Sequence, residues 1–435
     1  MSYFHSVTLD KDKCQGCTNC IKRCPTEAIR VRGGKAKIIK ERCIDCGECI
    51  RVCPYHAKLA VTDAFTLLND YEYNIALPAP SLYGQFKNTF DANVILTGLE
   101  EIGFDDVFEV ARGAEAVSAI TRQLMQEGTL QSPVISSACP AVVRLIKVRF
   151  PNLISHILNL LSPMEVAAMM ARREAKEKTA LPDEKIGVFF ITPCPAKVTS
   201  IKAPLALDHS YVSGAISAKD VCAKLLPILK TITEPKELSW AGMEGVSWAR
   251  SGGECEGTET MQYIAVDGID NVINILEQIE DEKLDDVDFV ELSACLGGCV
   301  GGVLNITNSF VTATRLKHIT DELPVRKLAA SLTPEDVMFR KQIEYEPIMK
   351  LDENFAVAMQ KMEQMDALYE NMPKLDCGSC GAPSCKALAE DIVRGFGNEN
   401  DCVFKMRERV RELAKELFDL EARPYGLSNQ KEEDK

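Results

Sequence analysis

The sequence contains no run of 18 apolar residues, so it predicts no transmembrane helix. The segment after Met1, SYFHSVTLDKDKC, lacks the apolar stretch that a signal peptide requires. No block of basic residues is present, and 50 Lys and Arg against 64 Asp and Glu give a net charge of −14. This balance argues against nucleic acid or an anionic membrane as a partner. We therefore expect a cytoplasmic protein, with roughly two to four domains for this length.

Motifs for nucleotide binding and serine hydrolysis are also missing, since the chain has no P-loop, no GxGxxG and no GxSxG. The five histidines show no ligand spacing. Cysteine, by contrast, is abundant, with 18 residues. Because cytoplasmic thiols stay reduced, this number indicates metal binding, and disulfides are the less favoured alternative.

The first eight cysteines repeat the pattern C-x2-C-x2-C-x3-C-P with a period of 29 residues. Four close thiolates suit a [4Fe–4S] cluster, and in this pattern the fourth cysteine ligates the other cluster. The two predicted sets are Cys14, Cys17, Cys20 and Cys53, and Cys43, Cys46, Cys49 and Cys24. Zinc is the alternative, although two cysteine pairs would satisfy it. Residues 1–62 resemble the bacterial two-cluster ferredoxin module.

The last cysteines form another dense group, with x2-x4-x16 spacing: Cys377, Cys380, Cys385 and Cys402. Glycines between them allow the backbone to wrap closely around a cluster. The spacing resembles the single-cubane domain of corrinoid iron–sulfur proteins, and a zinc knuckle is the alternative. The following residues, VFKMRERVRELAKELFDLEA, have apolar positions at helical spacing, so we expect an amphipathic helix that packs by its apolar face.

Residues 63–350 alternate short apolar runs with helical patterns, which predicts an α/β domain. The runs NIALPAP, SPVISSA, KIGVFFIT and DFVELSA predict buried strands. Segments 162–178 and 218–232 predict helices, and a capping-box pattern from Ser162 to Glu165 opens the first.

Three of these strands lead directly into cysteines, in the segments SSACP, TPCPAK and ACLGGCVGG. Sites in α/β sheets lie beyond the carboxyl ends of the strands, so four distant thiols can converge there. They are Cys139, Cys194, Cys295 and Cys299.

The three segments resemble the active-site motifs of [FeFe]-hydrogenases, TSCCPxW, MPCxxKxxE and ExMxCxxGCxxGGG. The resemblance implies that the four cysteines hold the cubane of an H-cluster. It further implies that Cys299 bridges to a two-iron subcluster carrying CO, CN⁻ and azadithiolate. Lys197 and Ser81 take the positions of the family's cyanide contacts, and the segment LLSPMEVAAMM is similar to the family's Ser-Pro helix.

The departures from these motifs concern proton transfer and side chains that surround the cluster without binding it. The family's proton-relay cysteine is replaced by Ala138, whose methyl group carries no proton. The relay acids are reduced to Glu115 in VARGAEAVSAI. Thr192 and Ser293 occupy methionine positions, and Ser200 replaces an acid, which places hydroxyls where they can tune the cluster. We expect slow turnover with H₂ binding retained.

Two cysteines remain outside the predicted ligand sets. Cys222, in a helical pattern, predicts a buried small hydrophobe. Cys255 lies in ARSGGECEGTE, where the family has a Thr-Gly-Gly turn near its site, so Cys255 or Glu254 can replace the lost proton donor.

An intact ligand set with alanine at the relay position resembles the sensory subclass of [FeFe]-hydrogenases without a PAS domain. The implied fold is a two-lobed α/β H-cluster domain at 63–350, after a ferredoxin-like α+β domain at 1–62 and before a small helical iron–sulfur domain at 351–435. The implied partners are H₂, protons, maturation enzymes and a redox partner, either a ferredoxin or a signalling protein. The alternatives are a metabolic ferredoxin-dependent hydrogenase, and a non-catalytic iron–sulfur assembly or electron-transfer protein without the two-iron centre.

Overall fold

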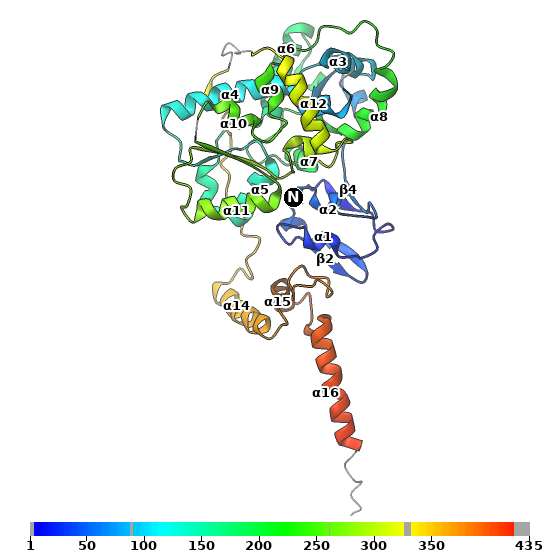
Figure 1. The fold of residues 1–435 in the computed structure, drawn as a ribbon, viewed down its shortest axis with the longest axis vertical. Helices are drawn as coiled ribbons and strands as arrows, with labels where there is room; N and C mark the ends of the chain where they lie inside the picture. The colour runs from blue at the N-terminus through cyan, green and yellow to red at the C-terminus, as the bar shows by residue number, and fades with distance from the viewer. Residues whose placement is uncertain (1–3, 88–89, 261, 326–331, 422–435) are drawn as a thin grey trace, which may run out of the picture. The chain divides into compact units, whose positions relative to one another are not determined.

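The computed structural model describes residues 4–87, 90–260, 262–325 and 332–421 (Figure 1). Its contacts divide the chain into two compact units. The larger comprises Met1–Gln15, Arg23–Ala28 and Ile38–Ile348, and the smaller comprises Gly16–Lys22, Ile29–Lys37 and Met349–Lys435. The cysteine-rich N-terminal segment thus contributes to both units. The division at 1–62, 63–350 and 351–435 stays a prediction.

The larger unit contains a four-stranded parallel sheet in the order β6-β5-β8-β9. The strands are Asp106–Val107, Tyr73–Pro78, Ile186–Thr192 and Gly214–Ser217 in that order. Every residue of β8 is buried, which is why its sequence is an unbroken apolar run. This observation confirms the buried strand predicted from KIGVFFIT.

Alternate side chains of β8 pack into different cores on the two faces of the sheet. Val188 and Phe190 belong to the core that contains α6, Pro163–Thr179. Phe189 and Ile191 belong to the core that contains α3 and α8. Those two helices span Ala92–Glu101 and Ala218–Ile228, and α8 holds the buried Cys222 as expected.

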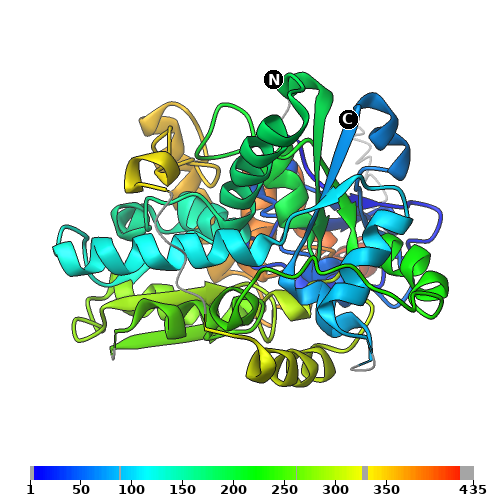
Figure 2. The same cartoon turned by 90° about the horizontal axis from the view of Figure 1, so that it is seen from above.

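A second parallel sheet, in the order β10-β11-β7, completes the α/β part. Its strands are Tyr263–Asp267, Phe289–Ser293 and Val134–Ile135. The long helix α4, Val110–Glu127, packs against α6 and is the long cyan helix in Figure 2. The other helices of this part are α5 Pro140–Arg149, α7 Pro195–Lys202, α9 Met243–Ser247, α10 Gly253–Thr258, α11 Ile269–Glu280, α12 Ser309–Glu322 and α13 Pro334–Val337.

The capping box predicted at the start of α6 is wrong. Ser162 is the N-cap residue but makes no side-chain cap hydrogen bond. The carboxylate of Glu165 instead accepts hydrogen bonds from Ser210 Oγ at 2.6 Å and from the backbone N–H of Tyr211 at 2.9 Å. A tertiary contact has therefore taken the side chain that the local motif would use.

The N-terminal strands are divided between the units. In the larger unit β1, Val7–Leu9, pairs antiparallel with β4, Lys58–Ala60, next to the short helix α2, Glu48–Arg51. The smaller unit contains α1, Asn19–Lys22, and the paired strands β2 and β3, Ile29–Arg32 and Lys35–Ile38, except for the last residue of β3, which belongs to the larger unit.

The rest of the smaller unit is helical, with α14 Phe355–Glu370, α15 Cys385–Val393 and α16 Val403–Glu421. Asp391 of α15 accepts hydrogen bonds from Arg30 Nε at 2.7 Å and from Arg32 Nη2 at 2.8 Å. Because Arg30 and Asp391 are both nearly buried, this network fixes the paired strands to α15.

The predicted C-terminal helix is present as α16, but its expected packing is wrong, because none of its residues is buried. Within the described ranges, no helix has both the length and the hydropathy needed to span a membrane.

Candidate metal centre

The four cysteines that follow the strands line one cavity of about 890 Å³, part of which is open to solvent. Cys139 and Cys194 are the N-cap residues of α5 and α7, where Pro140 and Pro195 begin the helices. The other two lie after β11, Cys295 in the connecting turn and Cys299 at the start of a short 3₁₀ helix. The parallel strands deliver all four to one place, as the sequence pattern suggested.

The thiols of this cavity influence one another electrostatically. Desolvation raises the pKa of Cys295 well above its usual value, and the neighbouring Cys194 and Cys139 raise it further. Desolvation and Cys194 also raise the pKa of Cys299 to about 12. The pKa values of Cys194, Cys295 and Cys299 are all raised, so a bound metal would be needed to stabilise their thiolates, and four sulfur donors suit an iron–sulfur cluster or zinc. Four cysteine sulfurs that line one cavity are the donor set of a [4Fe–4S] cluster.

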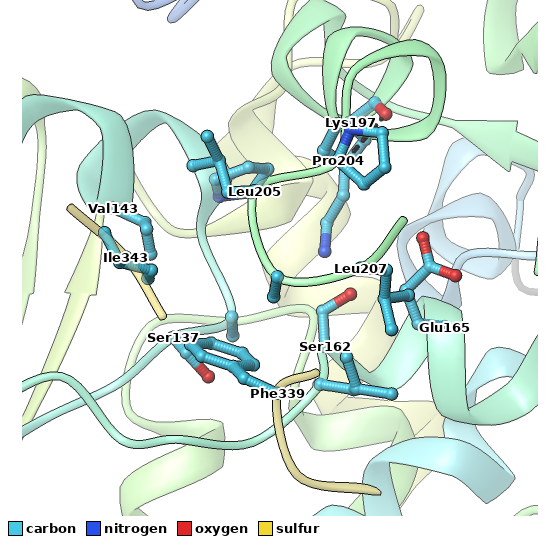
Figure 3. Close-up of a pocket in the computed structure, with 15 residues that line it drawn as sticks. Ser137, Val143, Ser162, Glu165, Lys197, Pro204, Leu205, Leu207, Phe339 and Ile343 are labelled. Carbon is cyan, nitrogen blue, oxygen red and sulfur yellow. Dashed lines mark hydrogen bonds between the residues drawn. The ribbon is translucent and has the colours of Figure 1, made fainter. Parts of the chain in front are cut away.

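Lys197 lies between this cavity and a second one of about 500 Å³, and it contributes to the lining of both. The side chain is 8% exposed, and its ammonium makes no hydrogen bond within the described part of the chain. Figure 3 shows the amine pointing into the second cavity, on the side of Ser162 and Glu165. A buried cation without an acceptor is poised for an anionic ligand.

Two buried carboxyl groups form the polar side of the larger cavity. Glu254 of α10 accepts a hydrogen bond from Ser136 Oγ at 2.6 Å. Glu291 of β11 accepts hydrogen bonds from the backbone N–H groups of Gly252, Glu254 and Cys255 at 2.9 to 3.1 Å. Burial, followed by the charge of Glu291, raises the pKa of Glu254 to about 8. Glu254 is therefore a carboxyl group that holds a proton near neutral pH.

Cys255, the other suggested donor, does not line the cavity. Its thiol is fully buried in the apolar core and donates a weak hydrogen bond to the carbonyl of Ile264 at 3.8 Å. Burial, with Glu291 and Glu254 nearby, raises the pKa of Cys255 far above its usual value. Of the two neighbouring residues, the structure brings Glu254 to the cavity and turns Cys255 away.

Ala138, which the sequence resemblance places at the relay position, lines both cavities. Ser81 is buried in the turn after β5, and its hydroxyl has no partner among the described residues. It lies beside Pro80, which lines the larger cavity.

The hydroxyls at the altered motif positions have different surroundings. Ser293 lines the larger cavity and Ser200 the second one. Thr192 donates to the carbonyl of Cys194 at 2.9 Å and accepts from its N–H at 3.2 Å, so it fixes the cysteine's backbone. Glu115 lines neither cavity; it accepts a hydrogen bond from Gly242 N–H, and burial raises its pKa to about 7.

Sequence reasoning gave no role to Ser136 or Glu291. Glu291 does carry a signal, since it is a lone acid in the otherwise apolar strand FVELS. A buried, charged residue in a central strand needs partners, and here three backbone N–H groups supply them. Ser136 has no comparable local signal.

The second predicted ligand set lies within the larger unit. Burial raises the pKa of Cys46, and Cys24, Cys49 and Cys43 raise it further. Cys24 Sγ accepts a hydrogen bond from the N–H of Ala28 at 3.2 Å. Thiols affect one another's pKa in this way only when they are close, so these four lie near one another, as a cluster requires.

The first predicted set is divided, with Cys14 and Cys53 in the larger unit and Cys17 and Cys20 in the smaller. Desolvation raises the pKa of Cys53, but hydrogen bonds from the N–H groups of Lys58 and Ala57 and the charge of Lys58 lower it by more, so the pKa is lowered overall. The ammonium of Lys58 is fully buried and has no hydrogen-bond partner in the described ranges. The ligand assignment of this set stays a prediction.

The C-terminal cysteines also share one hollow, within the smaller unit. Its lining includes all four predicted ligands, Cys377, Cys380, Cys385 and Cys402. Burial is the main cause of the raised pKa of Cys380. The charge of Arg32 lowers this pKa, and the neighbouring Cys402 and Cys377 raise it. The carboxylate of Asp376 accepts a hydrogen bond from the N–H of Cys385 at 2.6 Å. These donors and their spacing fit a cluster.

Family comparisons match three parts of the chain. The family described as iron only hydrogenase large subunit, C-terminal domain, matches residues 72–225 and 214–303, together more than half of the chain. A 4Fe-4S dicluster domain matches residues 6–54, and an Fe-S cluster family matches residues 372–404. All three regions of clustered cysteines thus fall in iron–sulfur families.

Individual relatives are more distant. The periplasmic [Fe] hydrogenase large subunit of Nitratidesulfovibrio vulgaris is 28% identical over 212 residues, 44% of this chain and 50% of that protein. Iron hydrogenase 1 of Clostridium pasteurianum is 21% identical over 257 residues, 48% of this chain and 44% of that protein. The chain therefore spans half or less of the length of these curated relatives.

Among solved structures, a variant of the [FeFe]-hydrogenase HydA1 of Chlamydomonas reinhardtii aligns with a TM-score of 0.45 at 16% identity, covering 59% of this chain and 87% of that one. The match over residues 72–303 includes all four cysteines of the larger cavity. On that match, the chain belongs to the family of the iron only hydrogenase large subunit, C-terminal domain.

Proposed function

We propose that this protein binds H₂ at an H-cluster and oxidises it reversibly to two protons and two electrons, with slow turnover that serves H₂ or redox sensing. The observation that carries the proposal is the single cavity lined by four cysteines and Lys197, with alanine at the relay position. A carboxyl group, Glu254, and a cation, Lys197, line the cavity beside the sulfur donors. Such groups can stabilise the charges that form when H₂ is split into a proton and a hydride.

In this proposal Cys139, Cys194, Cys295 and Cys299 hold the cubane, and Cys299 also bridges to the two-iron subcluster. The bound cluster would supply the redox chemistry, accepting the two electrons of H₂. Lys197 lines the cysteine cavity as well as the second cavity, so from the boundary between them its ammonium would turn to a cyanide ligand, which accounts for a buried cation that has no protein acceptor. Ser81 offers a second, otherwise unused hydroxyl.

Glu254 takes the proton-transfer role that Ala138 cannot perform. With a pKa of about 8, Glu254 can give up and regain a proton near neutral pH, and Ser136 Oγ holds its carboxylate in place. Because this route replaces the relay thiol by a buried carboxyl group that Ser136 holds in place, we expect slower proton transfer than with a relay cysteine. Slow turnover suits a protein that reports H₂ rather than consuming it.

The electrons leave through the accessory cubanes to a redox partner, a ferredoxin or a signalling protein. The N-terminal and C-terminal cysteine groups provide two candidate exits. Iron–sulfur potentials in proteins extend from about −700 to +450 mV, so ligand spacing alone does not rank the exits. Maturation enzymes would insert the two-iron centre, and the cytoplasm remains the proposed location.

Isotope exchange tests this function without any redox partner. Matured protein under H₂ in D₂O should release HD and D₂ above the level of protein purified without maturation. Exchange combined with fast dye-linked turnover would favour a metabolic hydrogenase. No exchange after metal analysis has confirmed insertion would overturn the proposal in favour of a non-catalytic iron–sulfur protein.

A further inference from the structure

The apolar side chains of α16 face solvent along its entire length. Met406, Val410, Leu413, Leu417 and Leu420 are each 47 to 61% exposed. None of the helix's residues is buried, and Figure 1 shows α16 as one uninterrupted helix in red. Scattered exposed leucines need no explanation, but a continuous row along one helix does.

The row has the spacing of a coiled-coil seam. Successive positions differ alternately by three and four residues, which is the a and d pattern of a heptad repeat. The a positions are Val410 and Leu417, and the d positions are Met406, Leu413 and Leu420. Val403, one heptad earlier, lines the hollow of the C-terminal cysteines and is not part of the seam. A helix that packs on a globular core usually has a wider apolar face at a period of 3.6 residues, whereas this strict seam suits another helix of the same kind.

The seam residues also suit two strands. A seam that contains only a and d positions is narrow enough to be covered by one partner helix, which gives a two-stranded coil. We propose that α16 binds α16 of a second copy of this chain, in an antiparallel two-stranded coiled coil.

The charges beside the seam determine the orientation. In a parallel pair, Glu416 at a g position would face the partner's Glu421 at an e position, and the two acids would repel. In an antiparallel pair centred between Val410 and Leu413, Arg409 faces the partner's Glu416, and this attraction occurs twice by symmetry. Within one chain Arg409 pairs with Glu412 at 3.1 Å and lies 3.9 Å from Glu416; all three side chains are exposed, so these weak pairs can exchange partners.

A membrane surface is the other occupant that an amphipathic helix can have. Interfacial helices carry an excess of Lys and Arg on the polar face, which anionic lipids attract. Residues 403–421 contain five basic and five acidic side chains, so the helix has no net charge to draw it to such a surface. The charge balance favours a second copy.

Sedimentation velocity of the full, anaerobically prepared chain tests the proposal, with two matched variants. Leu417 and Phe418 are adjacent and exposed by 60% and 70%, but only Leu417 lies in the seam. Leu417→Glu should weaken dimerisation at least tenfold, while Phe418→Glu should leave it within about twofold. Circular dichroism of both variants checks that the helix persists. Monomeric wild type up to 100 µM, or equal effects of the two variants, would overturn the proposal.

Charge variants test the orientation. Glu416→Arg should weaken an antiparallel dimer several-fold, and the added Arg409→Glu change should restore it. A stronger dimer with Glu416→Arg would indicate the parallel arrangement and overturn the antiparallel one. Wild type that is monomeric yet sediments with vesicles containing phosphatidylserine would assign the helix to membranes instead.

Discussion

Replacing Glu254 by Gln should slow hydrogen turnover without disturbing the cofactor. The amide keeps the shape of the carboxyl group and can still bond to Ser136, but it cannot exchange a proton near neutral pH. Burial raises the pKa of Glu254 well above the ordinary value of a carboxyl group, which favours the protonated form that a donor for H₂ evolution needs. General acid–base help contributes 10²- to 10⁴-fold in rate, so we expect a loss of about 10²-fold.

The pH dependence gives an independent readout. As the pH rises through about 8, Glu254 loses its proton, so the wild-type rate of H₂ evolution should fall across this range. The Glu254→Gln variant should lack this alkaline decrease because it has no carboxyl group to titrate. Its loss of about 10²-fold corresponds to about 2.7 kcal/mol of activation free energy.

The assay is dye-linked H₂ evolution by matured protein between pH 6 and pH 9, with infrared spectra to confirm equal cofactor content. Cys255→Ser is the matched control, since the neighbouring thiol faces Ile264 in the core, and its rate should stay within about twofold. The reasoning is refuted if Glu254→Gln keeps the wild-type rate and pH profile, or if Cys255→Ser loses as much activity.

Three further substitutions test other parts of the structure. Ala138→Cys places a thiol at a position that lines both cavities, so it should raise turnover by at least tenfold in the same assay. An unchanged rate would show that proton supply does not limit turnover. Lys58→Met removes a buried ammonium near Cys53, so the midpoint potential of that cluster should fall by on the order of 100 mV in an EPR-monitored titration, and an unchanged potential would contradict this. Asp391→Ala leaves the buried Arg30 without its carboxylate and should destabilise the smaller unit by about 3–5 kcal/mol, visible as a lower melting temperature, whereas unaltered melting would show that solvent replaces the pair.

The sequence predicted the elements that depend on local pattern and on strand direction. The buried strand β8 follows from its apolar run, and the meeting of Cys139, Cys194, Cys295 and Cys299 follows from their positions after parallel strands. The first feature needs only periodicity. The second needs strand direction and also the packing of two sheets, because Cys194 follows a strand of one sheet and the other three cysteines follow strands of the second.

The orientation of neighbouring side chains was beyond the sequence. Glu254 and Cys255 are adjacent on α10, so they point about 100° apart, and only the contacts of α10 with Glu291 decide which one faces the cavity. The pattern from Ser162 to Glu165 likewise predicted a cap, but a tertiary contact to residues 210–211 took the carboxylate.

The C-terminal helix illustrates the same limit. Its periodicity predicted the helix itself. The sequence did not predict which surface covers the apolar row, because that depends on tertiary or quaternary contacts. The strict alternation of three and four residues was present in the sequence and distinguishes a seam from a core-facing stripe.

Infrared spectroscopy of the matured protein, under argon and then under H₂, tests the central claim most directly. A two-iron centre anchored in the cavity at Cys299 should give CO and CN⁻ stretching bands that shift reversibly when H₂ is admitted, and Lys197→Met should move or abolish the CN⁻ bands. Absence of these bands, after metal analysis has confirmed that maturation supplied the iron, would contradict the account and leave an iron–sulfur protein without a hydrogen-binding centre.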